Sequence, residues 1–241
     1  MIISALSDIG NFRDINQDCI NYKIINEHEA YAVLCDGMGG HNAGEVAAKL
    51  TCDYMMDHFE EHEPFTCQED IRHWFYRLIK NANRLVNEKG ADNSAYRDMG
   101  TTVILAYIVD ECIYISHVGD SRAYIVTSES LEQITTDDTL VNALLEKGYI
   151  NKEQAKNHPQ RNILVQAVGV TDLLNVSFAV VHADTILLCS DGLYNSLSDN
   201  QIVEILKLDL TIQQKNEKLM ETAKQFGGLD NISTILIERG A

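Results

Sequence analysis

The feature that most constrains the fold is a pair of strand-length runs that are apolar at both odd and even positions. Residues 102–109 read Thr-Val-Ile-Leu-Ala-Tyr-Ile-Val, and residues 186–189 read Ile-Leu-Leu-Cys. A sheet with one wet face alternates apolar and polar residues, so both faces of these strands must be covered. Helices can cover one face, and a second sheet is the natural cover for the other. The pattern predicts an α+β fold, a four-layer α-β-β-α sandwich of two antiparallel sheets flanked by helices.

Seven runs rich in Val, Ile, Leu and Tyr have strand lengths. The two-residue loop Asp110-Glu111 predicts a hairpin, and the three residues 182–184 join two further runs. Connections this short favour antiparallel pairing at both places. The expected strands are 30–35, 101–109, 112–118, 123–126, 176–181, 185–189 and 232–237.

Helices are expected where apolar residues recur at the helical spacing. A long helix runs from Ile71 through Val86, and Thr66 with Glu69 predicts a capping box at its start. An earlier helix is expected to carry Val46, Ala47, Leu50, Tyr54 and Phe59. Two late helices are expected to begin with the capping boxes 198–201 and 211–214, and a short helix is expected at 140–145.

One domain is expected for the 241 residues 1–241, with a flap-like excursion at about 135–162. The excursion is more polar than the segments around it. No Gly/Ser-rich linker occurs, and the aspartates discussed below spread from position 36 to position 230. Cutting the chain anywhere would therefore separate them.

The charge balance excludes several classes of partner. Nineteen Lys and Arg against 36 Asp and Glu give a net charge of −17, which opposes nucleic acid and anionic membranes and suits cations. No apolar run approaches the roughly 18 residues of a membrane span, and the N-terminus lacks the pattern of a signal peptide. The six cysteines form no C-x-x-C pair and are expected to be reduced. We expect a cytoplasmic monomer without membrane insertion.

Four aspartates stand at the ends of apolar runs: Asp36, Asp120, Asp191 and Asp230. If these runs are strands of one core, their carboxylates converge at one end of it, where hard cations make such negative charge tolerable. A single Asp-Gly dipeptide is a weak signal, because most copies are ordinary turns. Several together, without a Cys or His cluster, favour Mg²⁺ or Mn²⁺. The sequence therefore predicts a metal-dependent enzyme.

Seven short motifs follow one another along nearly the whole chain. They are residues 7–18, 35–41, 100–102, 118–122, 158–162, 189–193 and 228–231. Any one is a short string, but seven in order are specific. In these motifs the sequence resembles bacterial members of the protein phosphatase 2C family, the metal-dependent Ser/Thr phosphatases. The double antiparallel sandwich of that family agrees with the layers expected above.

The resemblance implies a set of metal ligands. Asp36, Asp191 and Asp230 would bind two Mn²⁺ or Mg²⁺ ions, with Asp36 between the two ions. Gly37 would add its carbonyl oxygen. Asp120, with help from Asp191, matches the position where bacterial members hold a third and weaker ion.

The resemblance also implies a reaction and the residues that serve it. Arg13, Asp36 and Asp191 would be catalytic, with Arg13 binding the phosphate of the substrate. Asp18 and Asn231 would brace the site from behind the ligands. A water activated between the two ions would hydrolyse phosphoserine or phosphothreonine in proteins without a phospho-enzyme. The expected partners are phosphorylated proteins, including Ser/Thr kinases and their substrates.

Two positions depart from the family pattern. Met38 stands where animal relatives have a histidine that serves as a general acid, so that acid is not expected here; His41 lies three residues further on. Gln17 stands where many relatives have a glutamate. Two alternatives follow from other classes: a catalytically weak relative that binds phosphoproteins as a regulatory module, and a structural calcium protein. The first would lack a metal aspartate or Arg13, and calcium ligands usually lie within one loop.

Overall fold

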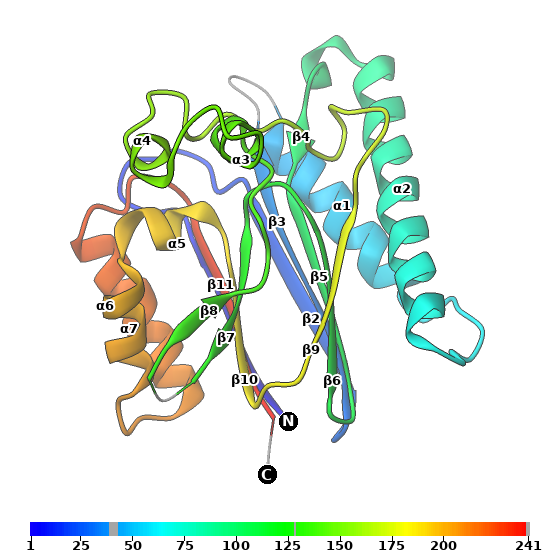
Figure 1. Cartoon of the computed structure of the whole chain (residues 1–241). Helices are drawn as coiled ribbons and strands as arrows, with labels where there is room; N and C mark the ends of the chain where they lie inside the picture. The colour runs from blue at the N-terminus through cyan, green and yellow to red at the C-terminus, as the bar shows by residue number, and fades with distance from the viewer. Residues whose placement is uncertain (39–42, 128, 240–241) are drawn as a thin grey trace.

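Two antiparallel sheets lie face to face, and helices cover their outer faces (Figure 1). The computed structural model describes residues 1–38, 43–127 and 129–239. The first sheet has five strands in the order β1 (Ile2–Asp8), β11 (Ile232–Glu238), β10 (Thr185–Cys189), β7 (Arg122–Val126) and β8 (Leu131–Gln133). The predicted four-layer sandwich is confirmed.

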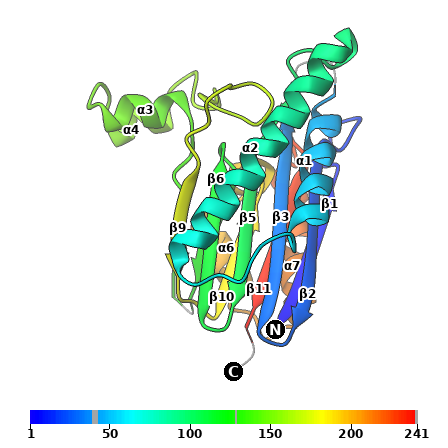
Figure 2. The same cartoon turned by 90° about the vertical axis from the view of Figure 1, so that its right-hand side faces the viewer.

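The second sheet has six strands and lies opposite the first. Its main path runs through β2 (Asp18–Asn26), β3 (Glu29–Met38), β5 (Val103–Val109), β6 (Cys112–Val118) and β9 (Ser177–Val181), while β4 (Gly100–Thr101) pairs with the end of β3. Figure 2 shows the two long helices α1 (Gly44–His58) and α2 (Gln68–Asp92) lying across this sheet.

Shorter helices complete the layers. The five-stranded sheet is covered by α5 (Asp191–Ser196), α6 (Asp199–Leu206) and α7 (Ile212–Gln225), and the 3₁₀ turn Ser94–Tyr96 follows α2. The helices α3 (Leu140–Glu146) and α4 (Lys152–Lys156) lie in the expected excursion, at the end of the sandwich away from the N-terminus (Figure 1).

The two-sided burial of the strands follows their alternation. In β3, Tyr31 and Val33 pack against the helices, whereas Ala32 and Leu34 pack between the sheets. In β10, Leu187 faces the helices of the other layer. Side chains of successive strand residues point to opposite faces, so one apolar run supplies two core layers. This is why these runs are apolar at both parities.

The two short connections behave differently. Asp110 has a φ of 50°, and β5 pairs with β6 in the register of the predicted hairpin. The antiparallel pairing expected between the two runs that residues 182–184 join is wrong, because β9 pairs with β6 while β10 pairs with β7 and β11. The chain crosses from one sheet to the other there. Three extended residues can span about 10 Å, the usual distance between packed sheets.

Other differences are local. The capping box of α2 consists of Cys67 and Asp70, one residue later than expected, and the Thr66 hydroxyl also donates to Asp70 Oδ2 at 2.7 Å. The predicted strand 101–109 breaks at Thr102 into β4 and β5. The capping boxes that start α6 and α7 are confirmed. The sequence did not predict strands β1, β2 and β8 or helices α4 and α5. The three strands are edge strands: β1 and β8 end the five-stranded sheet, and β2 ends the six-stranded sheet.

Two sequence expectations concern the whole chain. All six cysteines are unpaired. Among the described residues, no helix combines the length and the apolar character needed to cross a membrane.

Candidate metal and phosphate site

One cavity gathers the predicted residues from five separate segments. Asp36 lies near the end of β3, and Asp120 follows β6. Asp191 begins α5, with one residue between it and the end of β10, and Asp230 precedes β11. Arg13 comes from the loop between β1 and β2. The cavity has a volume of about 270 Å³, and Gln17, Gly37, Met38, Thr102, Asn162 and Leu164 complete its lining.

The backbone around Asp36 is fixed by the break between β4 and β5. The Asp36 amide donates to Thr102 Oγ1 at 3.0 Å, while the Thr102 amide and the Thr101 hydroxyl donate to the Asp36 carbonyl at 2.8 and 2.9 Å. A Cβ at Gly37 would lie 2.2 Å from the carbonyl oxygen of Gly44, so only glycine lets α1 begin this close to β3. The Asp-Gly dipeptide is therefore the end of a strand and not a free turn.

The carboxylates destabilise one another in the absence of a cation. Burial raises the pKa of Asp36 well above its ordinary value, and the charges of Asp18, Asp191 and other carboxylates add to this. Burial also raises the pKa of Asp191 to about 8, with further contributions from Asp120 and Asp230. Burial and then the charge of Asp137 raise the pKa of Asp120 to about 6. Such shifts mark a place that a bound cation would stabilise.

Arg13 and Asp230 form an ion pair, although the sequence predicted that Arg13 binds phosphate and that Asp230 binds a cation. Arg13 Nη2 donates to Asp230 Oδ2 at 2.7 Å, and the two side chains are 50% and 34% exposed. A half-exposed guanidinium can exchange one oxygen partner for another, since an exposed pair contributes little to stability.

The two bracing residues lie behind this lining. Asn231 Nδ2 donates to the carbonyls of Ile9 and Ile15 at 2.9 and 3.0 Å, and its Oδ1 accepts from the Gln17 amide at 2.8 Å. Asn231 thereby fixes both ends of the loop that carries Arg13.

Asp18 stands opposite Asp36 in the register of β2 and β3. Its Oδ2 accepts from the Ser190 hydroxyl at 2.8 Å, while its buried Oδ1 has no hydrogen-bond partner. Burial raises the pKa of Asp18 to about 6. An orphaned carboxylate oxygen directly behind Asp36 is a natural acceptor for a water bound to a cation.

A second group of residues beside Asp120 was not predicted. The Arg122 guanidinium donates to Asp137 through Nε at 3.0 Å and Nη2 at 2.7 Å, and its Cζ lies 3.6 Å from the centre of the Tyr194 ring. The Tyr194 hydroxyl in turn donates to the Asp120 carbonyl at 3.0 Å. The signal was present, because Arg122 closes the motif Gly-Asp-Ser-Arg and Asp137 stands at the start of the excursion.

The excursion borders the cavity. Its last residue, Asn162, and the following Leu164 line the cavity wall, and the Leu140 amide donates to the Ile163 carbonyl at 2.8 Å. Met38 also lines the cavity, whereas His41 lies outside the described residues.

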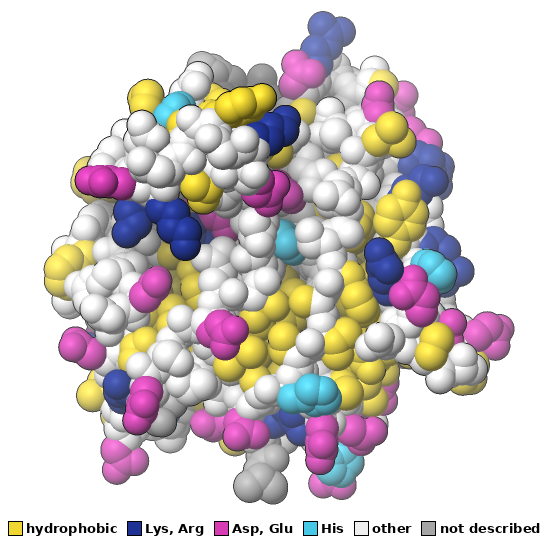
Figure 3. All heavy atoms as spheres, viewed as in Figure 1, with side chains coloured by type: hydrophobic (Ala, Val, Ile, Leu, Met, Phe, Trp, Pro, Cys, Tyr) yellow, Lys and Arg dark blue, Asp and Glu magenta, His cyan; other side chains and the backbone are white. Residues whose placement is uncertain are grey.

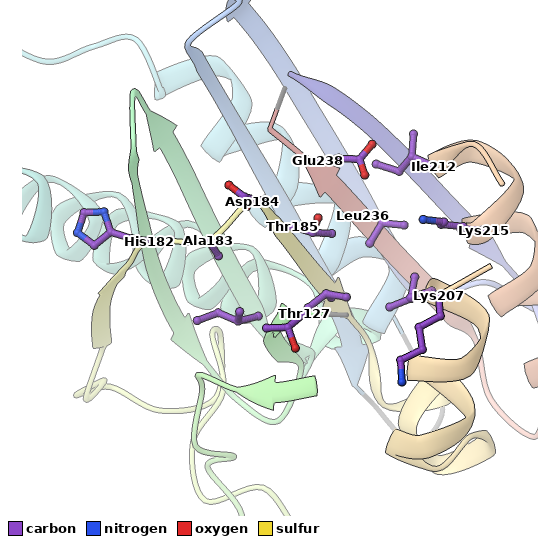
Figure 4. A pocket seen from close by; sticks show the side chains of 13 residues that line it. Thr127, His182, Ala183, Asp184, Thr185, Lys207, Ile212, Lys215, Leu236 and Glu238 are labelled. Carbon is purple, nitrogen blue, oxygen red and sulfur yellow. The ribbon is translucent and has the colours of Figure 1, made fainter. Parts of the chain in front are cut away.

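A larger cavity, of about 600 Å³, lies at the other end of the five-stranded sheet (Figure 4). Its lining combines apolar side chains with Lys207, Lys215, Asp184 and Glu238, and it contains none of the residues predicted for the metal and phosphate site. Figure 3 shows hydrophobic side chains gathered between the two sheets on the face of Figure 1. Volume alone does not indicate chemistry, so the smaller cavity with its convergent carboxylates is the better candidate.

The donor set of the smaller cavity fits hard divalent cations. It offers carboxylate and carbonyl oxygens without thiol or imidazole groups, which suits Mg²⁺ and Mn²⁺. Within the described residues, no three His, Cys, Asp or Glu side chains stand close enough together to hold a metal ion as they are. Asp230 is turned toward Arg13 instead. The carboxylates thus surround one cavity, and the binding of a cation would require their side chains to move closer to one another.

Comparisons with known proteins agree with this chemistry. The family model for protein phosphatase 2C matches residues 13–225. Protein phosphatase PhpP from Streptococcus pneumoniae is 37% identical over 240 residues, which cover 98% of this chain and 97% of the relative. The structure of Ser/Thr phosphatase Stp1 from Staphylococcus aureus superimposes with a TM-score of 0.92 at 35% identity, covering 99% of this chain and 95% of that chain.

A second solved structure contains metal. The catalytic domain of the Ser/Thr protein phosphatase PstP, in complex with two manganese ions, superimposes with a TM-score of 0.82 at 28% identity, covering 98% of this chain and 97% of that chain. The fold is that of these protein phosphatases. The chain belongs to the protein phosphatase 2C family, and the family and the enzyme class predicted from the sequence are confirmed.

Proposed function

We propose that this chain hydrolyses phosphoserine and phosphothreonine in proteins and uses Mn²⁺ or Mg²⁺ as its cofactor. The observation that carries this proposal is the convergence of Asp36, Asp120, Asp191 and Asp230 on one open cavity with Arg13. Relatives that are named Ser/Thr phosphatases support the substrate class, and the two manganese ions of the PstP structure support the cofactor.

The carboxylates would hold the cations. Asp36, fixed at the end of β3, would lie between two ions, with Asp191 and Asp230 as further ligands and the Gly37 carbonyl beside them. Asp120 with Asp191 would offer a third position. When bound, the cations supply the positive charge that lowers the pKa of a water molecule and balances the phosphoryl oxygens.

Arg13 would bind the phosphate of the substrate. Its guanidinium donates to one oxygen of Asp230 and is half exposed, so it can turn toward a phosphate that offers two oxygens. Asp230 would then become available to a cation. Asn231 supports this exchange, because it holds the ends of the Arg13 loop while the side chain turns.

The chain offers no thiolate for a covalent route through its buried cysteines. Burial raises the pKa of the Cys35 and Cys189 thiols, so both stay protonated near neutral pH. Met38 cannot donate a proton to the leaving alkoxide. That proton would come from solvent in the open cavity, and hydrolysis would proceed without a phospho-enzyme.

The proposed partners are phosphorylated proteins, among them Ser/Thr kinases and the substrates of such kinases. We further propose that the protein works in the cytoplasm and as a monomer. Its charge of −17 makes copies of the chain repel one another and opposes binding to anionic membranes and nucleic acids.

The test is hydrolysis of phosphoserine, phosphothreonine and phosphotyrosine peptides by chelated protein, with and without added Mn²⁺ or Mg²⁺. We expect release of phosphate from the first two peptides only after a cation is added, and loss of most activity in Asp36→Asn. The exposed Asp209→Asn serves as the matched control and should keep full activity. Peptide binding without turnover would support the regulatory module instead, and full turnover in chelator would contradict the proposal.

A further inference from the structure

Two loops at the rim of the cavity are tied to each other. The Asn11 amide donates to the Gly228 carbonyl at 2.8 Å, and Asn11 Nδ2 donates to the Gly227 carbonyl at 3.0 Å. Two residues further along each loop, Arg13 and Asp230 form their ion pair. Figure 1 shows the blue loop after β1 beside the red segment before β11. The loops therefore form one surface next to Arg13.

This surface carries large apolar side chains that are exposed among the described residues. Phe12 stands between Asn11 and Arg13, Leu229 stands between their partners Gly228 and Asp230, and each is 69% exposed. We define the loop patch as the four residues Phe12, Ile15, Phe226 and Leu229, of which Ile15 is 56% and Phe226 is 62% exposed. Exposed apolar groups that gather at a functional site usually mark a contact surface.

The loop patch is held in place rather than loosely attached. Gly10 has a φ of 79°, and a Cβ there would lie 2.2 Å from the Asp230 carbonyl oxygen, so the two loops pass in close contact. Asn231 bonds to the carbonyls at both ends of the first loop. A surface that is already ordered loses little entropy when a partner binds.

We propose that the loop patch docks the substrate polypeptide and selects apolar side chains next to the phosphorylated residue. This inference rests on the proposed function. A phosphate bound by Arg13 places the neighbouring substrate residues within about 4 Å per residue of that contact, so they come within reach of the loop patch. On this rim, Phe12 and Leu229 present apolar area, while the exposed Asp14 beside Arg13 disfavours acidic neighbours.

The test uses three substrates and matched variants. One phosphothreonine peptide has Leu and Phe beside the phosphorylated residue, a second has Ser at these positions, and p-nitrophenyl phosphate reports the phosphate site alone. The double variant Phe12→Ser with Leu229→Ser removes exposed side chains and should not affect folding. Ile2→Ser is the control. Ile2 is 55% exposed and is the first residue of β1, whereas the loop with Arg13 follows Asp8, the last residue of that strand.

We expect wild-type kcat/KM to be about fivefold higher for the apolar peptide than for the Ser peptide. The double variant should lose this preference and hydrolyse p-nitrophenyl phosphate like the wild type. Equal wild-type kcat/KM for the two peptides would overturn the docking proposal and leave the proposed function intact. No metal-dependent turnover of any substrate would overturn both. A wild-type dimer that the double variant converts to a monomer, with unchanged peptide preference, would assign the patch to a second copy instead.

Discussion

Asparagine at position 191 is expected to stabilise the metal-free protein and to remove most of its activity. Asp191 begins α5 and lines the cavity with three other carboxylates. Asparagine has the same shape, and its side-chain oxygen can still accept the hydrogen bond that Asn195 Nδ2 donates at 3.1 Å. It cannot become negatively charged, so it removes the repulsion and also removes a cation ligand.

The size of the effect follows from the pKa of Asp191. Burial, together with the charges of Asp120, Asp230 and Asp18, raises this pKa from 3.8 to about 8. One pKa unit corresponds to about 1.4 kcal/mol, so at about pH 7.5 the folded metal-free state carries a penalty of at most about 5 kcal/mol. Water enters the open cavity and side chains relax, so we expect about 1 to 2 kcal/mol to be recovered, or about 2 to 8 °C in Tm.

Thermal unfolding in chelator, followed by unfolding with added Mn²⁺, measures both effects. Wild type, Asp191→Asn and the exposed control Asp209→Asn are compared. Mn²⁺ at a hundredfold excess over its Kd should stabilise the wild type and the control by about 2.7 kcal/mol and the variant by less. A variant that melts below the wild type in chelator would refute the electrostatic reasoning.

Three further predictions concern the same cavity. The Tm of metal-free wild type should fall as pH rises from about 6 to about 8. In the folded state Asp191 has a pKa of about 8 and Asp120 a pKa of about 6, so both keep protons that an unfolded carboxyl has lost above its ordinary pKa of 3.8. A Tm that rises over this pH range would contradict the prediction. Gly37→Ala should lower the free energy of unfolding in urea by about 2 to 4 kcal/mol, since its Cβ would lie 2.2 Å from the Gly44 carbonyl oxygen; an unchanged midpoint would mean that the backbone adapts freely. Arg13→Ala should raise KM for p-nitrophenyl phosphate about tenfold with a smaller loss in kcat; the reverse pattern in steady-state kinetics would assign Arg13 to the transition state.

Much of the fold was predictable because the core is encoded in local patterns. Strands such as β6 and β10 match the expected ranges because they are continuous apolar runs, and the capping boxes that start α6 and α7 are strictly local signals. The crossing at residues 182–184 was not predictable from loop length, since a short connection fits either a hairpin or a step between packed sheets. The edge strand β2 was not predicted, because its apolar residues, such as Tyr22 and Ile24, are exposed and alternate with polar residues rather than forming a continuous apolar run.

The sequence indicated residues that the structure brings to one cavity, but it did not indicate their contacts. The aspartates could be selected because they stand near the ends of apolar runs, and all of them line one cavity. The ion pair between Arg13 and Asp230 joins residues far apart in the sequence, and no local pattern encodes it. The network of Arg122, Asp137 and Tyr194 could not be predicted from a local pattern either, because its three members come from β7, the excursion and α5.

The central claim is that separate carboxylates hold divalent cations in one cavity, and a Mn²⁺ titration tests it most directly. Chelated protein is titrated with Mn²⁺, and free Mn²⁺ is followed by its electron paramagnetic resonance signal. The account predicts at least two equivalents bound to the wild type and fewer to Asp36→Asn. No bound Mn²⁺, or the same number of equivalents in the variant, would contradict it.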